Sequence, residues 1–167
     1  HHGWSAAGIP EQQKTTSGAL AEFRILCFRT GYGQIPLTCL KRWPQASVIA
    51  VDRDLLGTSF VQYNTDRLEL SKNLEIRESA HWPDAIQTDE KFNLILGELS
   101  PSADEAVALS ELRAMESSLT IGGEALILCL DKIEKDWVKK FATKSKLSIF
   151  KVLSRESYTV VRLTKNK

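Results

Sequence analysis

Short apolar runs alternate with segments of helical periodicity along most of this chain, and that order is the strongest constraint on its fold. The runs rich in β-branched and other large apolar residues lie at 23–28, 47–51, 74–78, 92–98 and 124–130. Strands separated by helices must pair mainly in parallel, because a parallel neighbour needs a crossover connection. Right-handed crossovers then place helices on both faces of the sheet. The sequence therefore predicts an α/β fold built on a doubly wound, mostly parallel sheet.

The C-terminal region departs from this alternation. Two strand-like runs, 147–153 and 157–163, are separated only by Ser154–Arg155–Glu156. So short a connection predicts a hairpin. The hairpin adds an antiparallel strand at one edge, and the predicted sheet then has seven strands.

The helical segments carry recognisable start and stop signals. They cover 35–43, a stretch after Asp54, 102–119 and 133–145. Asp54 is expected to cap its helix, with Leu55, Leu56, Phe60 and Tyr63 on the face toward the core. Ser102 is expected to begin the third helix, and Gly122–Gly123 to end it.

The composition is that of one folded domain, with 43% hydrophobic and 26% charged residues among 167. Residues 1–17 form a polar leader, partly irregular or tag-derived, before a domain at 18–167. No signal peptide is visible, and no apolar run reaches the roughly 18 residues that span a bilayer. The three cysteines lack CxxC spacing, which predicts buried thiols rather than a disulfide framework or metal site. These features favour a cytoplasmic protein without membrane or metal partners.

Positive charge is concentrated near the C-terminus. Residues 131–167 hold 11 Lys or Arg but only 4 Asp or Glu, although the whole chain has a net charge of +1. Such asymmetry can mark a nucleic-acid-binding face. Lys139, Lys140 and Lys144 are the candidate RNA-binding residues, and a merely solvated helix is the alternative.

A glycine-containing turn, Thr30–Gly31–Tyr32–Gly33, follows the first apolar run. In a doubly wound sheet, ligands bind at the carboxyl ends of the strands. The second run ends at Asp52, 19 residues beyond Gly33, where a carboxylate can accept hydrogen bonds from a ribose diol. A nucleotide-type site is therefore expected here, with a purely structural turn as the alternative.

The "GYG" loop, "VIAVD", "FNLIL", "GGEALIL" and the terminal hairpin together resemble the class I S-adenosylmethionine-dependent methyltransferases. Within that class the chain is similar to the rRNA guanine-N2 methyltransferases with a "methyltransferase small domain", over about residues 20–165. The order of elements is fairly specific, whereas each motif alone is weak. The resemblance implies S-adenosylmethionine as cofactor.

The resemblance also implies positions for the cofactor. The family loop reads roughly D-x-G-x-G-x-G. Its acid falls on Cys27 and its first glycine on Arg29, while Gly31 and Gly33 match the other two. Cysteine cannot supply the acid's charge, and arginine puts a long cation beside the cofactor position. The cofactor-binding positions that the resemblance implies are Cys27, Arg29, Thr30, Gly31, Gly33, Asp52, Ser79 and Ala80.

In the family, the fourth strand ends in N-P-P-F/Y, which holds the amino group to be methylated. Here the Asn position is Glu98, followed by Leu99, Ser100 and Pro101. Glu98 is the candidate catalytic residue, because a carboxylate can accept a hydrogen bond from an amino group. The base clamp itself is not recognisable.

Two functions follow from this resemblance. The chain is either a methyltransferase acting on RNA, or a degenerate, non-catalytic half that binds RNA or a second methyltransferase-like domain. NAD binding is less favoured, because the fingerprint started by "GYGQIP" has Pro36 at its last glycine. His81 is expected to be a packing or surface residue rather than a general base. Trp82 is the tryptophan most expected to stack on a base.

Overall fold

The computed structural model describes residues 22–99, 104–130 and 132–167. The expected leader at 1–17, together with Ser100, Pro101 and Ser102, lies outside these ranges. The elements are β1 (Arg24–Phe28), α1 (Gln34–Arg42), β2 (Ser47–Asp52), α2 (Leu55–Arg67), η1 (Ser71–Asn73), β3 (Leu74–Glu78), η2 (Trp82–Ala85), β4 (Phe92–Glu98), α3 (Glu105–Ser118), β5 (Leu119–Cys129), α4 (Lys132–Ala142), β6 (Leu147–Ser154) and β7 (Thr159–Lys165).

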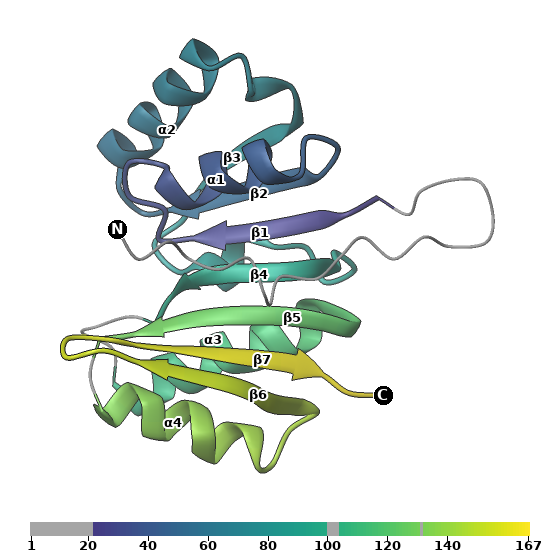
Figure 1. The fold of residues 1–167 in the computed structure, drawn as a ribbon, viewed down its shortest axis with the longest axis vertical. Helices are drawn as coiled ribbons and strands as arrows, with labels where there is room; N and C mark the ends of the chain where they lie inside the picture. Colours follow the sequence, from purple (N-terminus) through teal and green to yellow (C-terminus); the bar gives the residue numbers. More distant parts are fainter. Residues whose placement is uncertain (1–21, 100–103, 131) are drawn as a thin grey trace.

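A single seven-stranded sheet has the order β3-β2-β1-β4-β5-β7-β6 (Figure 1). The first five strands pair in parallel, and β7 pairs antiparallel with both β5 and β6. The predicted fold class and the terminal hairpin are thereby confirmed. Strand order reverses between β1 and β4, and in such sheets the ligand crevice lies at this switch point.

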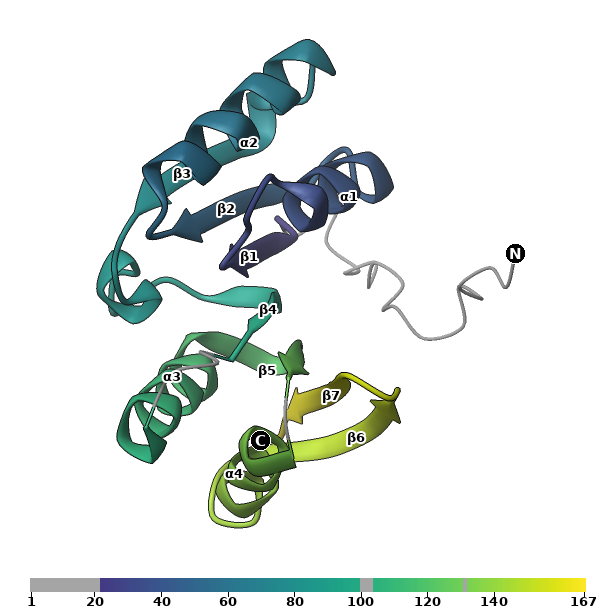
Figure 2. The same ribbon diagram turned by 90° about the vertical axis from the view of Figure 1, so that its left-hand side faces the viewer.

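Two apolar clusters cover the two faces of the sheet. Alternate residues of β1 point to opposite faces, so Ile25 and Cys27 join one cluster while Leu26 and Phe28 join the other. The first cluster packs under α1, and the second packs under α3 and α4. Figure 2 shows α1 and α3 on opposite sides of the sheet.

Helix α2 differs from the sequence prediction. Its cap is as expected, because the Asp54 side chain accepts a hydrogen bond from the Leu56 N–H. Its core face is not, because the four apolar residues assigned to that face are exposed. The buried residues of α2 are instead small or polar apart from one valine: Gly57, Thr58, Val61 and Thr65. The prediction of that core face is therefore wrong.

The third helix is also shorter than predicted. α3 begins with Asp104 as its cap, whose carboxylate accepts from the Val107 N–H, and ends at Ser118. Gly122 and Gly123 do not end it; they lie inside β5, where Gly122 has a positive φ of 77°. A bulge between Phe92 and Leu94 in the β4–β5 pairing accommodates this irregular start of β5.

Candidate functional site

The loop between β1 and α1 has the tight backbone that its glycines predict. Gly31 (φ 51°) and Gly33 (φ 92°) are both in the left-handed region, and so is Arg29 (φ 51°). Left-handed backbone is uncommon for a residue with a side chain. Arg29 therefore keeps the conformation of the glycine that the resemblance places there, while adding a cation. Thr30, between them, is buried.

Asp52 lies at the carboxyl end of β2, directly beside this loop. Its Oδ2 accepts from the Gly31 N–H at 2.9 Å and from the Thr30 hydroxyl at 3.4 Å. Its Oδ1 accepts from the Arg53 N–H at 2.7 Å and from the Asp54 N–H at 3.1 Å. Each carboxylate oxygen therefore already has two protein donors, which is about its full capacity. The side chain holds the loop to the end of β2.

The Arg29 side chain crosses from the end of β1 to α3. Its Nη2 pairs with Glu111 Oε1, its Nη1 lies 3.3 Å from Glu111 Oε2, and Nη1 also donates to the carbonyl oxygen of Glu98. Glu111 is 0% exposed. A forked arginine–carboxylate pair of this kind is both strong and geometrically fixed. It spans the ends of β1 and β4, on either side of the switch point.

Sequence reasoning missed Glu111, although a signal was present. The residue stands between Ala108 and Leu112 on the buried side of α3, where a carboxylate needs a partner. The cation already singled out in the loop, Arg29, is that partner.

Glu98, the last residue of β4, has a partly buried carboxyl group. Burial raises its pKa, and the positive charge of Arg29 partly offsets this effect. Leu99, which the resemblance places on the first proline of the clamp, is fully buried and donates its N–H to the Leu128 carbonyl. The structure thus places Glu98 beside Arg29, at the switch point.

Cys27 faces the α1 side of the sheet, away from Arg29 and Glu111. It is fully buried, and burial followed by the neighbouring Cys39 raises the pKa of its thiol. A neutral thiol is therefore the stable form. All three cysteines are buried thiols, as expected.

The loop after β3 is closed by its own hydrogen bonds. The Ser79 hydroxyl donates to the His81 carbonyl and accepts from the His81 N–H. Ala80 is exposed and stands between them. Trp82 is 3% exposed and stacks on Phe28 with 5.0 Å between ring centroids. The expectation that Trp82 is available to stack on a base is wrong, because this ring is part of the core.

His81 lies between two polar side chains: Nε2 is 3.1 Å from Ser110 Oγ, and Nδ1 is 3.6 Å from Asp84 Oδ1. The Ser110 hydroxyl also donates to the Val107 carbonyl inside α3, and the direction of its bond to Nε2 follows the tautomer of the histidine. The group packs η2 against α3, in keeping with the expected structural role of His81.

The candidate RNA-binding lysines lie on α4 and just beyond it. Lys139 and Lys144 are exposed, and Lys140 pairs with Glu105 of α3 at 2.8 Å. Acidic side chains also lie in this region: Asp136 of the same helix is exposed, whereas Glu134 is buried and accepts from the Leu130 N–H. The hairpin turn with Arg155 lies at the same end of the sheet as the loop after β1 (Figure 1).

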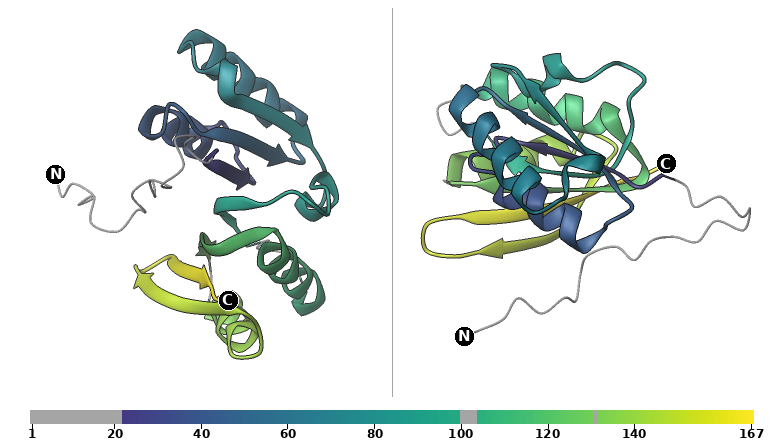
Figure 3. Two further views of the ribbon diagram at one scale, coloured as in Figure 1. Left: turned by 90° about the vertical axis from the view of Figure 1, so that its right-hand side faces the viewer. Right: turned by 90° about the horizontal axis from the view of Figure 1, so that it is seen from above.

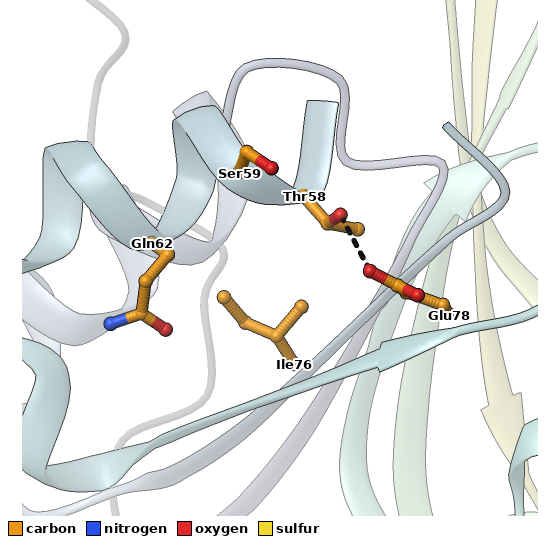
Figure 4. Close-up of a pocket in the computed structure, with 5 residues that line it drawn as sticks. All are labelled: Thr58, Ser59, Gln62, Ile76 and Glu78. Atoms are coloured by element: carbon orange, nitrogen blue, oxygen red, sulfur yellow. Dashed lines mark hydrogen bonds between the residues drawn. The ribbon is translucent and has the colours of Figure 1, made fainter. Parts of the chain in front are cut away.

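A pocket of about 380 Å³ lies between α2 and β3 (Figure 4). Thr58, Ser59 and Gln62 line it from the helix, and Ile76 and Glu78 line it from the strand. The Thr58 hydroxyl donates to Glu78 Oε1 at 3.2 Å. Among the described residues, no cluster of three His, Cys, Asp or Glu side chains is placed to bind a metal. Within the same ranges, no helix has the length and apolar character of a membrane span.

Comparison by sequence finds no matching family and no significantly similar curated protein. Comparison by structure finds many related folds. TrmN from Thermus thermophilus has a TM-score of 0.72 and 20% identity over 86% of this chain, which spans 44% of TrmN. An rRNA methylase from Streptococcus thermophilus has a TM-score of 0.69 and 17% identity, covering 87% of this chain and 88% of that one.

A third similar structure is the ribosomal protein L11 methylase from Lactobacillus delbrueckii subsp. bulgaricus. Its TM-score is 0.69 at 14% identity, covering 90% of this chain and 73% of that one. The TM-scores establish a shared fold, and at identities this low they establish the fold alone. The seven-stranded sheet with its antiparallel hairpin gives this chain the Rossmann-like fold of the class I methyltransferases.

Proposed function

We propose that this chain is a methyltransferase-fold module that binds RNA and does not itself use S-adenosylmethionine. The observation that carries the proposal is the ion pair between Arg29 and the buried Glu111. It places a guanidinium at the switch point, where the fold would hold the methionine end of the cofactor. To bind there, the methionine end of the cofactor would have to displace or adjoin this ion pair, and breaking the pair would leave the Glu111 carboxylate buried without its partner, which is unfavourable.

Two further residues are also poorly suited to bind S-adenosylmethionine. Asp52 already accepts four hydrogen bonds from the protein, so a ribose diol would have to break some of them. Cys27 stands where the family has an acid, and its buried thiol is neutral. A neutral thiol cannot balance the charge of the methionine ammonium group. The residues present therefore do not fit the cofactor that the resemblance implies.

The RNA part of the proposal rests on charge. α4 and the turn after it carry six lysines within residues 132–146, and Lys139, Lys140 and Lys144 are exposed among them. Contacts with phosphates supply most of the sequence-independent affinity of a protein for nucleic acid. TrmN and the rRNA methylase share this fold, and the latter is named as a methylase of rRNA. These points together favour RNA over other polyanions.

A second candidate is a cofactor-using RNA methyltransferase, and one observation favours it. Arg29, Gly31 and Gly33 all keep left-handed backbone, so the loop retains the turn of a cofactor-binding strand end. In that case Asp52 would hold the ribose and Glu98 would face the substrate amine. Ser79 and Ala80 would then lie near the adenine.

Titration calorimetry with S-adenosylhomocysteine separates the two candidates. The wild-type chain should give no binding heat at ligand concentrations up to about 1 mM, a limit that corresponds to about 4 kcal/mol of binding free energy. An unrelated methyltransferase that binds the cofactor serves as the positive control. Binding heat in the wild type would overturn this proposal and favour the cofactor-using candidate instead.

Fluorescence anisotropy with a structured RNA tests the binding surface. Changing Lys139, Lys140 and Lys144 to Glu should weaken binding more than tenfold and reduce the salt slope by roughly 2 to 3. The matched control changes Lys41, Lys72 and Lys91 to Glu, which alters the net charge equally on other exposed surfaces. Equal losses in both triple variants would show only a net-charge effect and would remove α4 from the site.

A further inference from the structure

Helix α2 presents its apolar side chains to solvent. Leu56 is 62%, Phe60 41% and Tyr63 62% exposed, and their spacing at i, i+4 and i+7 puts them on one side of the helix. Tyr32, in the loop after β1, is 65% exposed and meets the Phe60 ring edge-on at 5.4 Å. We call these four residues the α2 surface.

Packing under α2 fixes this orientation. A Cβ added at Gly57 would come within 3.1 Å of the Gly31 carbonyl oxygen, and one added at Gly33 within 3.2 Å of Val61. The buried hydroxyls on this side are satisfied locally, since Thr65 donates to the Val61 carbonyl. Rotating the helix to bury Phe60 and Tyr63 would insert rings where only small residues fit. The packing beneath α2 therefore keeps the α2 surface exposed.

The α2 surface is large enough to form the centre of a protein–protein interface. Three aromatic side chains and one leucine, each about half exposed or more, offer on the order of 400 Å² of mainly apolar surface. Patches of this size on a monomer commonly mark an interaction site. A stable dimer interface buries about 800 Å² per partner, so this surface would supply its apolar centre.

The charges at the two ends of α2 are complementary to each other. Arg53 and Asp54 precede the helix, and Asp66 and Arg67 end it, all exposed. In an antiparallel pair centred between Ser59 and Phe60, Leu56 lies opposite Tyr63 of the second copy. The same register puts Arg53 opposite Asp66 of the second copy, and the antiparallel helix dipoles are also favourably arranged. The apolar and the charged contacts thus agree on one register.

We infer that the α2 surface is a two-fold interface between two copies of this chain. RNA is a poorer occupant, because the charges around the stripe include Asp54 and Asp66 as well as the two arginines. The left view of Figure 3 places α2 and the β6–β7 hairpin at opposite ends of the molecule. A dimer formed through α2 therefore leaves Lys139, Lys140 and Lys144 of both copies free to bind RNA. This inference is independent of the proposed function, since it requires neither RNA nor cofactor.

Sedimentation velocity over a concentration series tests the interface. The wild type should pass from monomer to dimer between about 1 and 100 μM, and Tyr63→Lys should weaken the dimer at least tenfold. The matched control is Ile121→Lys, which places the same charge at an equally exposed apolar residue of β5 (67%) and should leave the dimer unchanged. Circular dichroism confirms that each variant is folded.

A charge swap tests the register. Arg53→Glu and Asp66→Lys should each weaken the dimer, and the double variant should restore it, because the exchanged pair is again complementary. A wild type that stays monomeric at 100 μM would overturn the inference. So would a double variant as weak as the product of the two single effects, because a different partner for α2 would give no such compensation.

Discussion

Arg29 and Glu111 form a buried ion pair that joins the loop after β1 to the middle of α3. The Arg29 side chain is 24% exposed, while that of Glu111 is 0% exposed. Both members matter, because an isolated carboxylate is very unfavourable in such surroundings. In this fold the pair spans the switch point, so a contact that stabilises the chain also occupies a region that serves ligands elsewhere.

Breaking this pair from one side should be costly. Arg29→Met leaves the Glu111 carboxylate buried without its partner, and we expect a loss of about 2–4 kcal/mol in the free energy of unfolding. Arg29→Met combined with Glu111→Leu removes both charges and should be more stable than Arg29→Met alone. Urea unfolding of the variants measures both effects.

Lys41→Met is the control for this comparison, because Lys41 is exposed and surface changes usually stay within about 0.5 kcal/mol. If the effects of Arg29→Met and Glu111→Leu on the free energy of unfolding simply add in the double variant, Glu111 does not depend on Arg29 for its charge balance. The pair then has no structural role.

Asp52 should prove to be a stabilising residue even without any ligand. Asp52→Asn replaces a carboxylate oxygen by an NH₂ group, which cannot accept from the N–H groups that now surround it. We expect a loss of about 1–3 kcal/mol, the usual penalty for unsatisfied buried donors. Thermal unfolding of the ligand-free protein is the measurement. An unchanged Tm would mean that Asp52 does not hold the loop.

Much of the fold was predictable because each strand of a buried parallel sheet is a short apolar run that can be recognised in the sequence alone. The predicted runs at 74–78 and 92–98 coincide with β3 and β4, and the short connection after 153 identified the hairpin. The orientation of α2 was not predictable from periodicity. Its apolar stripe is real, but close contacts at Gly57 and Gly33 decide which side faces the sheet, and periodicity carries no information on such contacts.

The candidate site divides in the same way. Position along the chain correctly placed Arg29, Gly31 and Asp52 at adjoining strand ends, because topology alone requires it. What each side chain does there was not predictable, since it depends on partners distant in sequence. Glu111 is 82 residues from Arg29, and the four donors of Asp52 are known only once the loop is built. That these residues do not bind S-adenosylmethionine stays a prediction, and the calorimetric titration tests it.

Glu98 should reduce stability at neutral pH. Burial raises the pKa of its carboxyl group, so folding disfavours the charged form despite the nearby Arg29. For a carboxyl with a raised folded-state pKa, the favourable contribution is present at low pH and is lost as pH rises through that pKa. Glu98→Gln should therefore raise the Tm at pH 7 but not at pH 3.5. A variant equally stabilised at both pH values would point to packing rather than charge.

Glu90 should have the opposite pH dependence. Hydrogen bonds from Arg77, the Gln87 N–H and Arg24 lower the pKa of its carboxyl from 4.5 to about 2. Stability from this group is therefore present above about pH 4.5 and is lost as pH falls toward 2. Glu90→Gln should lose about 3 kcal/mol at pH 7 but much less at pH 2.5, since a shift from 4.5 to about 2 at about 1.4 kcal/mol per pKa unit corresponds to roughly that free energy.

Equilibrium unfolding of both proteins across this pH range measures the difference directly. Asp89→Asn, an exposed neighbour, is the control and should lower stability at neither pH. A constant gap between wild type and Glu90→Gln from pH 7 to 2.5 would contradict an ionic role for Glu90.

Gly97 should be intolerant of any side chain, because β4 passes directly over the Phe28 ring. A Cβ at this position would lie 2.5 Å from two atoms of that ring, well inside van der Waals contact. Phe28 cannot easily move away, since its ring is buried and also stacks on Trp82. Gly97→Ala should therefore cost about 1–3 kcal/mol in the free energy of unfolding through overpacking.

A double-mutant cycle measured by urea unfolding tests this cause. Replacing the ring by a smaller side chain in Phe28→Leu should make the additional Gly97→Ala change less costly than it is in the wild type. Strict additivity of the two changes would mean that Gly97 is needed for its backbone freedom and not for the space it leaves.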